Sequence, residues 1–131
     1  MTAKVLRNYS LTIDAVEYAG QTSQVVFVPP QAVEWTGGAG NVEVDYDTSA
    51  AQVTIGYADD DAAASLVRVL ADPARWGDKV ACVWKPQGAA AGPTYTSEIT
   101  LGPGQIGGSV GGFRANTVTL RSTWPTIADP I

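Results

Sequence analysis

Alternation of residue type with a period of two limits the fold of this chain more than any other feature. The pattern returns at residues 9–13, 53–57, 80–84 and 95–101, between turns rich in the 14 glycines and 8 prolines. Residues two apart on a strand share one face, so such segments are typical of strands. About eight of them, in a length that suits one domain of residues 1–131, predict an all-β sandwich or barrel.

One segment departs from this pattern and predicts a single helix beside the sheet. Apolar residues recur at helical spacing over residues 62–70, and Pro73 follows them. Asp59, Asp60 and Asp61 stand directly before the segment. Carboxylates at that place cap a helix and suit its dipole, so we expect these three residues to cap a helix of about three turns.

Two strand segments carry further expectations. Residues 25–28 are apolar at every position, so the strand is either central in the sheet or covered by another subunit. Pro29 and Pro30 end it, because neither proline can donate a hydrogen bond to a ladder. Residues 32–35 and 42–47 flank the glycine-rich segment 36–41, which predicts a hairpin with a six-residue tip.

The two ends of the chain are expected to form arms. Residues 1–7 precede the first alternating segment, and residues 125–131 hold two prolines and no period, so both are predicted to be extended. The last strand spans residues 113–124 but changes parity, which predicts a bulge near Asn116. The opening residues contain no continuous apolar stretch, and so predict no secretory signal.

Composition argues against several kinds of chemistry. The chain has no histidine, which excludes His-assisted nucleophiles and His-ligated metals. Its lone cysteine, Cys82, cannot form an intramolecular disulfide, and its place in an alternating apolar strand predicts that it packs in the core. Gly102, Gly104 and Gly107 match a dinucleotide-binding spacing, but a proline interrupts it and no helix is expected to follow. We therefore predict a protein that is not an enzyme and has no metal ion or cofactor.

Charge is unevenly distributed along the chain. The net charge is −5, and nine of the 13 acidic residues lie between Arg7 and Arg68, where no basic residue occurs. Either the fold interleaves opposite charges within a monomer, or an acidic surface meets a basic surface on the next copy. Without a basic cluster, the chain is not expected to bind nucleic acid, because phosphate neutralisation supplies most of that affinity.

Three acidic residues fall on one strand. Glu43, Asp45 and Asp47 alternate with apolar residues, so they are predicted to share a face, with Glu34 a candidate for the same face across the hairpin. Three interpretations stay open. The face is simply solvated, or a carboxylate pair hydrolyses glycosides, or an acidic wall repels a polyanion.

The order of several segments resembles the tail tube proteins (major tail proteins) of long-tailed bacteriophages, especially phages of actinobacteria. The resemblance covers most of the chain, and no single motif carries it. Its parts are the opening residues 3–11, Tyr18-Ala19-Gly20, Trp35-Thr36-Gly37-Gly38, the helix, Trp84-Lys85-Pro86, residues 92–96, Ile106-Gly107-Gly108 and Val118-Thr119-Leu120.

This resemblance implies a structural protein of the virion tail, assembled in the cytoplasm of a bacterial host and lacking a membrane anchor. Six copies would form a ring, and stacked rings would form a hollow tube that genome DNA crosses on ejection without specific binding. The implied partners are other copies, the tape measure and tail terminator proteins, and the tail tip or baseplate. The alternatives are a carbohydrate- or receptor-binding β-sandwich module, and a terminator or baseplate ring of the same fold.

The resemblance also implies roles for individual residues. The acidic strand residues Glu43, Asp45 and Asp47 would face the lumen. The arms and the hairpin tip would make contacts between rings, with the loops at residues 88–92 or 102–112 as alternatives to the short tip. The contact residues implied in this way are Lys4, Arg7, Gly37, Gly38, Gly40, Asn41, Trp124 and Ile131.

Overall fold

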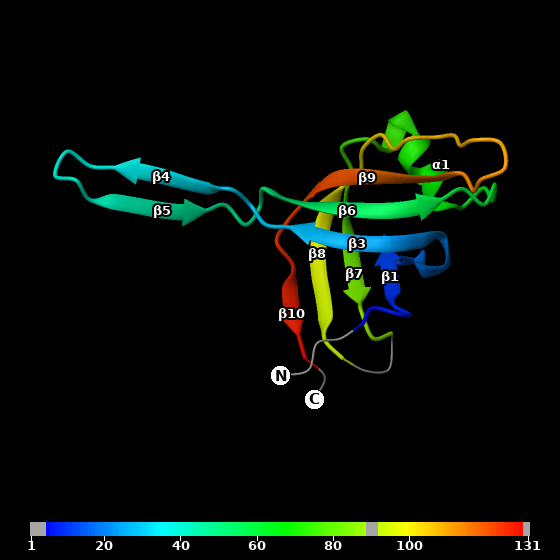
Figure 1. Cartoon of the computed structure of the whole chain (residues 1–131), viewed down its shortest axis with the longest axis horizontal. Coiled ribbons are helices and arrows are strands. Elements are labelled where there is room, and N and C mark those ends of the chain that lie inside the picture. Colours follow the sequence, from blue (N-terminus) through cyan, green and yellow to red (C-terminus); the bar gives the residue numbers. More distant parts are fainter. Residues whose placement is uncertain (1–4, 89–91, 130–131) are drawn as a thin grey trace.

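The computed structural model describes residues 5–88 and 92–129, and it confirms the all-β prediction (Figure 1). One short α-helix, α1 (Leu66–Ala71), and two 3-10 turns, η1 (Ala19–Gln21) and η2 (Pro73–Arg75), accompany ten strands. The strands are β1 (Ser10–Ile13), β2 (Val16–Glu17), β3 (Thr22–Val28), β4 (Ala32–Thr36), β5 (Val42–Tyr46), β6 (Ala51–Ala58), β7 (Lys79–Lys85), β8 (Thr94–Thr100), β9 (Ala115–Ser122) and β10 (Thr126–Ala128).

Eight strands form one antiparallel sheet that folds back on itself. The order is β2-β1-β7-β8-β9-β6-β3. β10 also pairs with β8, on the edge of β8 that does not pair with β7. Within the described chain, β8 and β9 are joined by a single residue pair, Ile99 with Ser122. The sheet bends at this narrow junction, so β3, β6 and β9 run across β1, β7 and β8 (Figure 1). The arrangement is that of an orthogonal sandwich.

The core lies between the two halves of the bent sheet. Alternate residues of both halves point inward, as the period of two predicts, and α1 closes one end with three buried side chains. Trp84 packs among Tyr9, Phe27 and Tyr95, with ring centroids 6.3, 6.1 and 5.3 Å away. The buried aliphatic residues and cysteine are Leu11, Ile13, Val25, Val53, Ile55, Leu66, Val67, Leu70, Val80, Cys82, Ile99, Leu101, Val118 and Leu120.

The helix is shorter than predicted, and its expected cap is wrong. It begins at Leu66 rather than near residue 62, and Asp59, Asp60 and Asp61 lie outside its first turn. Ser65 occupies the N-cap position without a side-chain capping bond, and the side chain of Gln21 accepts the hydrogen bond of the Leu66 amide at 2.8 Å. A tertiary contact therefore starts this helix, which local spacing could not reveal.

The strand apolar on both faces lies at an edge of the sheet, so the expectation of a central position is wrong. β3 pairs with β6 on one side, and it ends before Pro29 as predicted. Val25 is buried, whereas Val26 is 45% exposed on the outer face. Cover by another subunit, the second interpretation of this strand, stays a prediction.

The end of the chain also differs from the expectation. β9 pairs with β6 in an unbroken register from Ser122 to Ala115, so no bulge lies near Asn116. The apparent change of parity arises because Phe113 belongs to the preceding loop and not to the strand. The segment expected to be a free C-terminal arm is held by β10, which pairs with β8 over three residues.

The inward and outward faces of the β3–β6 pair give a test of this core. Ile55 on β6 is fully buried, so Ile55→Ala should lower the free energy of unfolding by about 2–5 kcal/mol. The outward Val26→Ala should cost no more than about 0.5 kcal/mol. Urea unfolding followed by tryptophan fluorescence measures both. Equal losses at the two positions would contradict the assigned faces.

Candidate assembly surface

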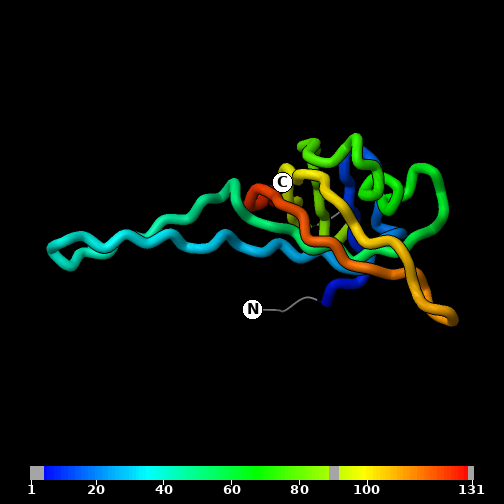
Figure 2. The backbone as a smooth tube through the Cα atoms, turned by 90° about the horizontal axis from the view of Figure 1, so that it is seen from above, coloured from blue at the N-terminus to red at the C-terminus, as the bar shows by residue number. Residues whose placement is uncertain are grey.

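A long β-hairpin projects from the body of the protein (Figures 1 and 2). Its strands β4 and β5 pair with each other from Ala32 with Tyr46 to Thr36 with Val42, and form a sheet separate from the main one. All ten strand residues are exposed. The predicted hairpin is therefore confirmed, but its whole length, rather than its tip alone, extends into solvent.

The tip of the hairpin closes through backbone hydrogen bonds. The amide of Gly37 donates to the carbonyl of Asn41 at 2.8 Å, and that of Gly40 donates to the carbonyl of Gly37 at 2.9 Å. Gly40 has a φ of 85°, and a Cβ at Gly37 would collide with the Asn41 side chain. A Cβ at Gly38 would meet open space.

The register assigns the acidic residues to faces. Paired residues of antiparallel strands share a face, so Glu43 lies beside Trp35 and Asp45 beside Val33. Glu34 pairs with Val44 and therefore lies on the opposite face, so its expected place beside the other carboxylates is wrong.

Asp47 follows the end of β5, in the turn at the base of the hairpin. Its carboxylate accepts hydrogen bonds from the Ser49 hydroxyl at 2.6 Å and the Ser49 amide at 3.0 Å. These bonds lower the pKa of Asp47. Of the three predicted lumen residues, Glu43 and Asp45 share a strand face, while Asp47 holds a turn.

Apolar side chains cover much of both hairpin faces. Their exposed fractions lie between 49% and 64%, although a two-stranded hairpin is at best marginally stable in water by itself. Exposed apolar patches of this kind mark surfaces that another molecule covers. The residues are Val33, Trp35, Val42, Val44 and Tyr46, and these form the candidate assembly surface.

The hairpin carboxylates make no ion pair in the described chain, although the charge of Arg121 adds to the lowering of the pKa of Asp47. The ion pairs found there join Arg75 to Asp14 at 2.9 Å and to Asp78 at 3.6 Å, and join Arg114 to two other aspartates. The fold therefore does not interleave opposite charges at the hairpin. Its four acidic residues, from Glu34 to Asp47, are accompanied by no lysine or arginine. Among residues 5–88 and 92–129, the cations without an ion pair are Arg7, Arg68, Lys79, Lys85 and Arg121.

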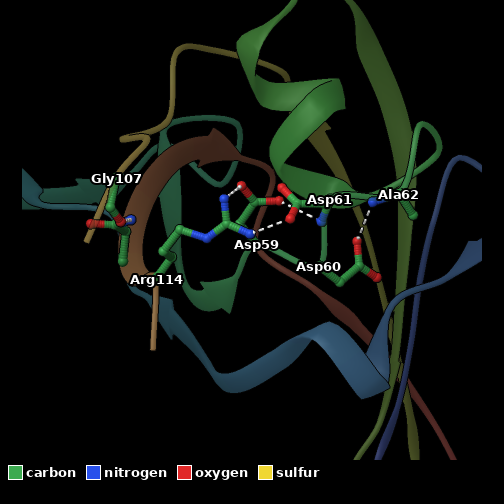
Figure 3. A network of polar contacts seen from close by, with 7 residues as sticks. Asp59, Asp60, Asp61, Ala62, Gly107 and Arg114 are labelled. Atoms are coloured by element: carbon green, nitrogen blue, oxygen red, sulfur yellow. Dashed lines mark hydrogen bonds and ion pairs between the residues drawn. The ribbon is translucent and has the colours of Figure 1, made fainter. Parts of the chain in front are cut away.

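Of the three aspartates expected to cap the helix, Asp59 and Asp61 pair with Arg114 instead (Figure 3). The guanidinium lies 3.3 Å from the Asp59 carboxylate and 2.7 Å from that of Asp61, whose φ is 62°. The Asp59 carboxylate accepts a hydrogen bond from the amide of Asp61, and the Asp60 carboxylate accepts one from the amide of Ala62. The hydrogen bond from Arg114 lowers the pKa of Asp61. The network ties the end of the glycine-rich loop to the turn after β6.

The glycine-rich loop of residues 102–114 lies at the end of the molecule opposite the hairpin (Figures 1 and 2). The Tyr57 hydroxyl donates to the backbone carbonyl of Gln105 at 2.6 Å, and the side-chain amide of Asn116 donates to the backbone carbonyl of Gly107 at 3.1 Å. No helix follows these glycines in the described structure, as the sequence indicated. Phe113 is 93% exposed, so this end has an apolar surface of its own.

The other predicted contact residues have varied places. Lys4 and Ile131 lie outside the described residues, and Arg7 is exposed just before β1. Trp124 lies just after the end of β9, and its amide donates to the carbonyl of Thr48 at 2.7 Å at the base of the hairpin. A carbohydrate-binding module would need exposed tryptophans to stack on sugars. Trp35 and Trp124 are exposed, whereas Trp84 packs in the aromatic cluster.

Other kinds of site were sought in the same residues. Cys82 is fully buried, as predicted, and burial raises the pKa of its thiol to about 11. Across residues 5–88 and 92–129, no three acidic or cysteine side chains are grouped as ligands of a metal ion. In the part of the chain that the structure describes, no helix is both long and apolar enough to span a membrane.

Comparison of the chain with protein-family models, with curated proteins and with solved structures finds no match. The functional argument therefore depends on the surface itself. Sequence reasoning concentrated on the tip glycines and the acidic residues of the hairpin, and missed its apolar residues. The signal was present, because Val33 and Trp35 alternate on β4 just as Val42, Val44 and Tyr46 alternate on β5.

The Arg114 network predicts a matched pair of loop variants. Arg114→Gln should raise the rate of thermolysin cleavage within residues 102–114 by about two- to fivefold, because exposed ion pairs contribute modestly. Arg121→Gln removes a cation without an ion pair and should leave the rate unchanged.

The same network should depend on pH. Since the pKa of Asp61 is lowered, the contribution of the Arg114–Asp61 pair to stability is present above the ordinary pKa of an aspartate. The contribution disappears as the pH falls through the lowered value, which hydrogen exchange corrected for intrinsic rates would detect.

Proposed function

We propose that this chain is a structural subunit of a bacteriophage tail tube, in which six copies form a ring and rings stack into a conduit for genome DNA. The observation that carries the proposal is the exposed hairpin β4–β5. Its apolar residues are solvated in a single chain, although its length and composition require a covering surface.

Two further properties favour copies of the same chain as the covering partner. The hairpin is acidic and has no cation, while unpaired cations lie on the body. Surfaces of opposite charge on one subunit favour a head-to-tail contact between copies. Such a contact gives rings when the rotation from one copy to the next closes, and filaments when it does not. A tube of stacked rings uses both kinds of contact.

The resemblance of the sequence to tail tube proteins names the particular assembly. Under this proposal the protein lies in the virion tail, and its other partners are the tape measure, the terminator and the tail tip or baseplate. DNA passes without specific binding. Glu43 and Asp45, which share one hairpin face, are the lumen candidates, because like charge keeps phosphates from adhering.

The first test removes the apolar surface of the hairpin. The triple variant Val33→Ser, Trp35→Ser and Val44→Ser should keep the wild-type circular dichroism spectrum, since these side chains are exposed, but should sediment as a monomer. Negative-stain electron microscopy should show rings or hollow tubes for the wild type and none for the variant. Val16→Ser, which changes an exposed valine away from the hairpin, is the control.

Three outcomes would contradict the proposal. Tubes formed by the triple variant would mean that the hairpin is not the assembly surface. A wild-type protein that stays monomeric at high concentration, even with tail-tip components, would indicate a binding module instead. Single rings that never stack would favour the terminator or baseplate alternative.

The second test concerns the lumen. In virions that contain Glu43→Lys with Asp45→Lys, fewer tails should assemble, because the hairpin carboxylates also face cations of the next copy. Among the particles that do assemble, fewer should deliver DNA, because lysines on the wall attract phosphates. Infectivity per particle counted by microscopy is the measurement. Asp47 is left unchanged because it holds Ser49. Glu98→Lys, on the body, is the control and should leave infectivity unchanged. Unchanged infectivity of the hairpin variant would mean that the face with Glu43 and Asp45 does not line the lumen.

A further inference from the structure

Strands β3, β6 and β9 form a layer with one end far from the hairpin (Figure 1). A hollow of about 640 Å³ lies at that end. Its walls are the beginning of β3, the end of β6 and the beginning of β9, with Phe113 and Gln105 from the glycine-rich loop. None of its lining residues is charged. They are Gly20, Gln21, Thr22, Ser23, Gln24, Gly56, Tyr57, Ala58, Gln105, Phe113, Ala115, Asn116 and Thr117.

The chemistry of the hollow matches that of the hairpin tip. Residues 36–41 of the tip carry no charge, and Trp35 exposes 62% of its surface directly before them. Phe113, almost fully exposed, supplies an aromatic surface at the hollow. The centres of protein interfaces are depleted in charge and enriched in aromatic residues, and both surfaces have this character.

The hairpin and the hollow lie at opposite ends of β3 and β6. β3 begins at the hollow and leads through Pro29 and Pro30 into β4, while β5 leads back into β6, which ends at the hollow (Figures 1 and 2). A second copy displaced along these strands can therefore bring its tip to the hollow of the first. This contact leaves one free tip and one free hollow, so it repeats without closing.

Charge at the margin of the hollow also suits the hairpin. A smaller hollow of about 280 Å³ adjoins it, shares Gly20, Thr22 and Ser23 with it, and is lined by Arg7. Arg7 makes no ion pair among the described residues. The strands of the hairpin behind the tip carry carboxylates and no cation, so opposite charges would meet beside an uncharged centre.

We propose that the hollow at the ends of β3, β6 and β9 receives the hairpin tip of a second copy of this chain, with Trp35 against Phe113. The inference rests on the proposed self-assembly, and it adds the surface that receives the hairpin. Because this contact repeats without closing, under the proposed function it is the contact between successive rings.

Thiol cross-linking tests this contact directly. Gly38→Cys places a thiol at the tip, where a side chain meets open space, and Thr117→Cys places one at the exposed floor of the hollow. The wild-type chain is a blank, because Cys82 is fully buried. A short bismaleimide should give covalent dimers in an equimolar mixture of the two variants at least tenfold above either variant alone. A chain with both substitutions should give a ladder of dimers, trimers and longer products.

Ala74→Cys, exposed on η2, replaces Thr117→Cys as the matched control and should give no dimer with the tip variant. Tubes that form without cross-links between positions 38 and 117 would overturn the inference and leave the proposed function standing. Dimers formed by the tip variant alone would also overturn it, because they require hairpins to pair with each other. A ladder without tubes would support the contact and count against the tube. A mixture that neither cross-links nor assembles would overturn both.

Discussion

The packing of one bent sheet against itself is the contact on which the rest of this structure depends. β6 and β9 turn Val53, Ile55, Val118 and Leu120 inward, against apolar residues of β1, β7 and β8. Because the two halves are joined by little more than the pair of Ile99 with Ser122, they can cross and enclose one core. Burial of these inner faces directs every alternate residue outward, into solvent.

The hairpin is outside this core, and that separation has a physical consequence. Its strands gain cross-strand pairs but no packing from the body, so its apolar side chains stay solvated in a single chain. A subunit that covers the hairpin with another copy recovers the burial on assembly, at the cost of ordering two surfaces.

The sequence predicted those features that depend on neighbours in the chain. Period two indicated the strands, Pro29 ended β3, and Cys82 was correctly expected in the core. The features that depend on distant residues were missed. The start of α1 is fixed by Gln21, 45 residues away, and the aspartates before it pair with Arg114 instead of capping. Glu34 was assigned to the wrong face, because only the register with β5 decides which residues lie beside it.

By itself, the sequence determined the all-β class, the hairpin with its glycine tip, and the acidic character of that hairpin, since each follows from local spacing and composition. Tertiary structure alone decided that β3 lies at an edge, that the hairpin leaves the body, and that a hollow lies at the opposite end of the same strands. The reason is that local sequence patterns indicate which side chains are apolar and favour burial. Only the pairing and bending of the sheet decide which ones the chain can bury unaided.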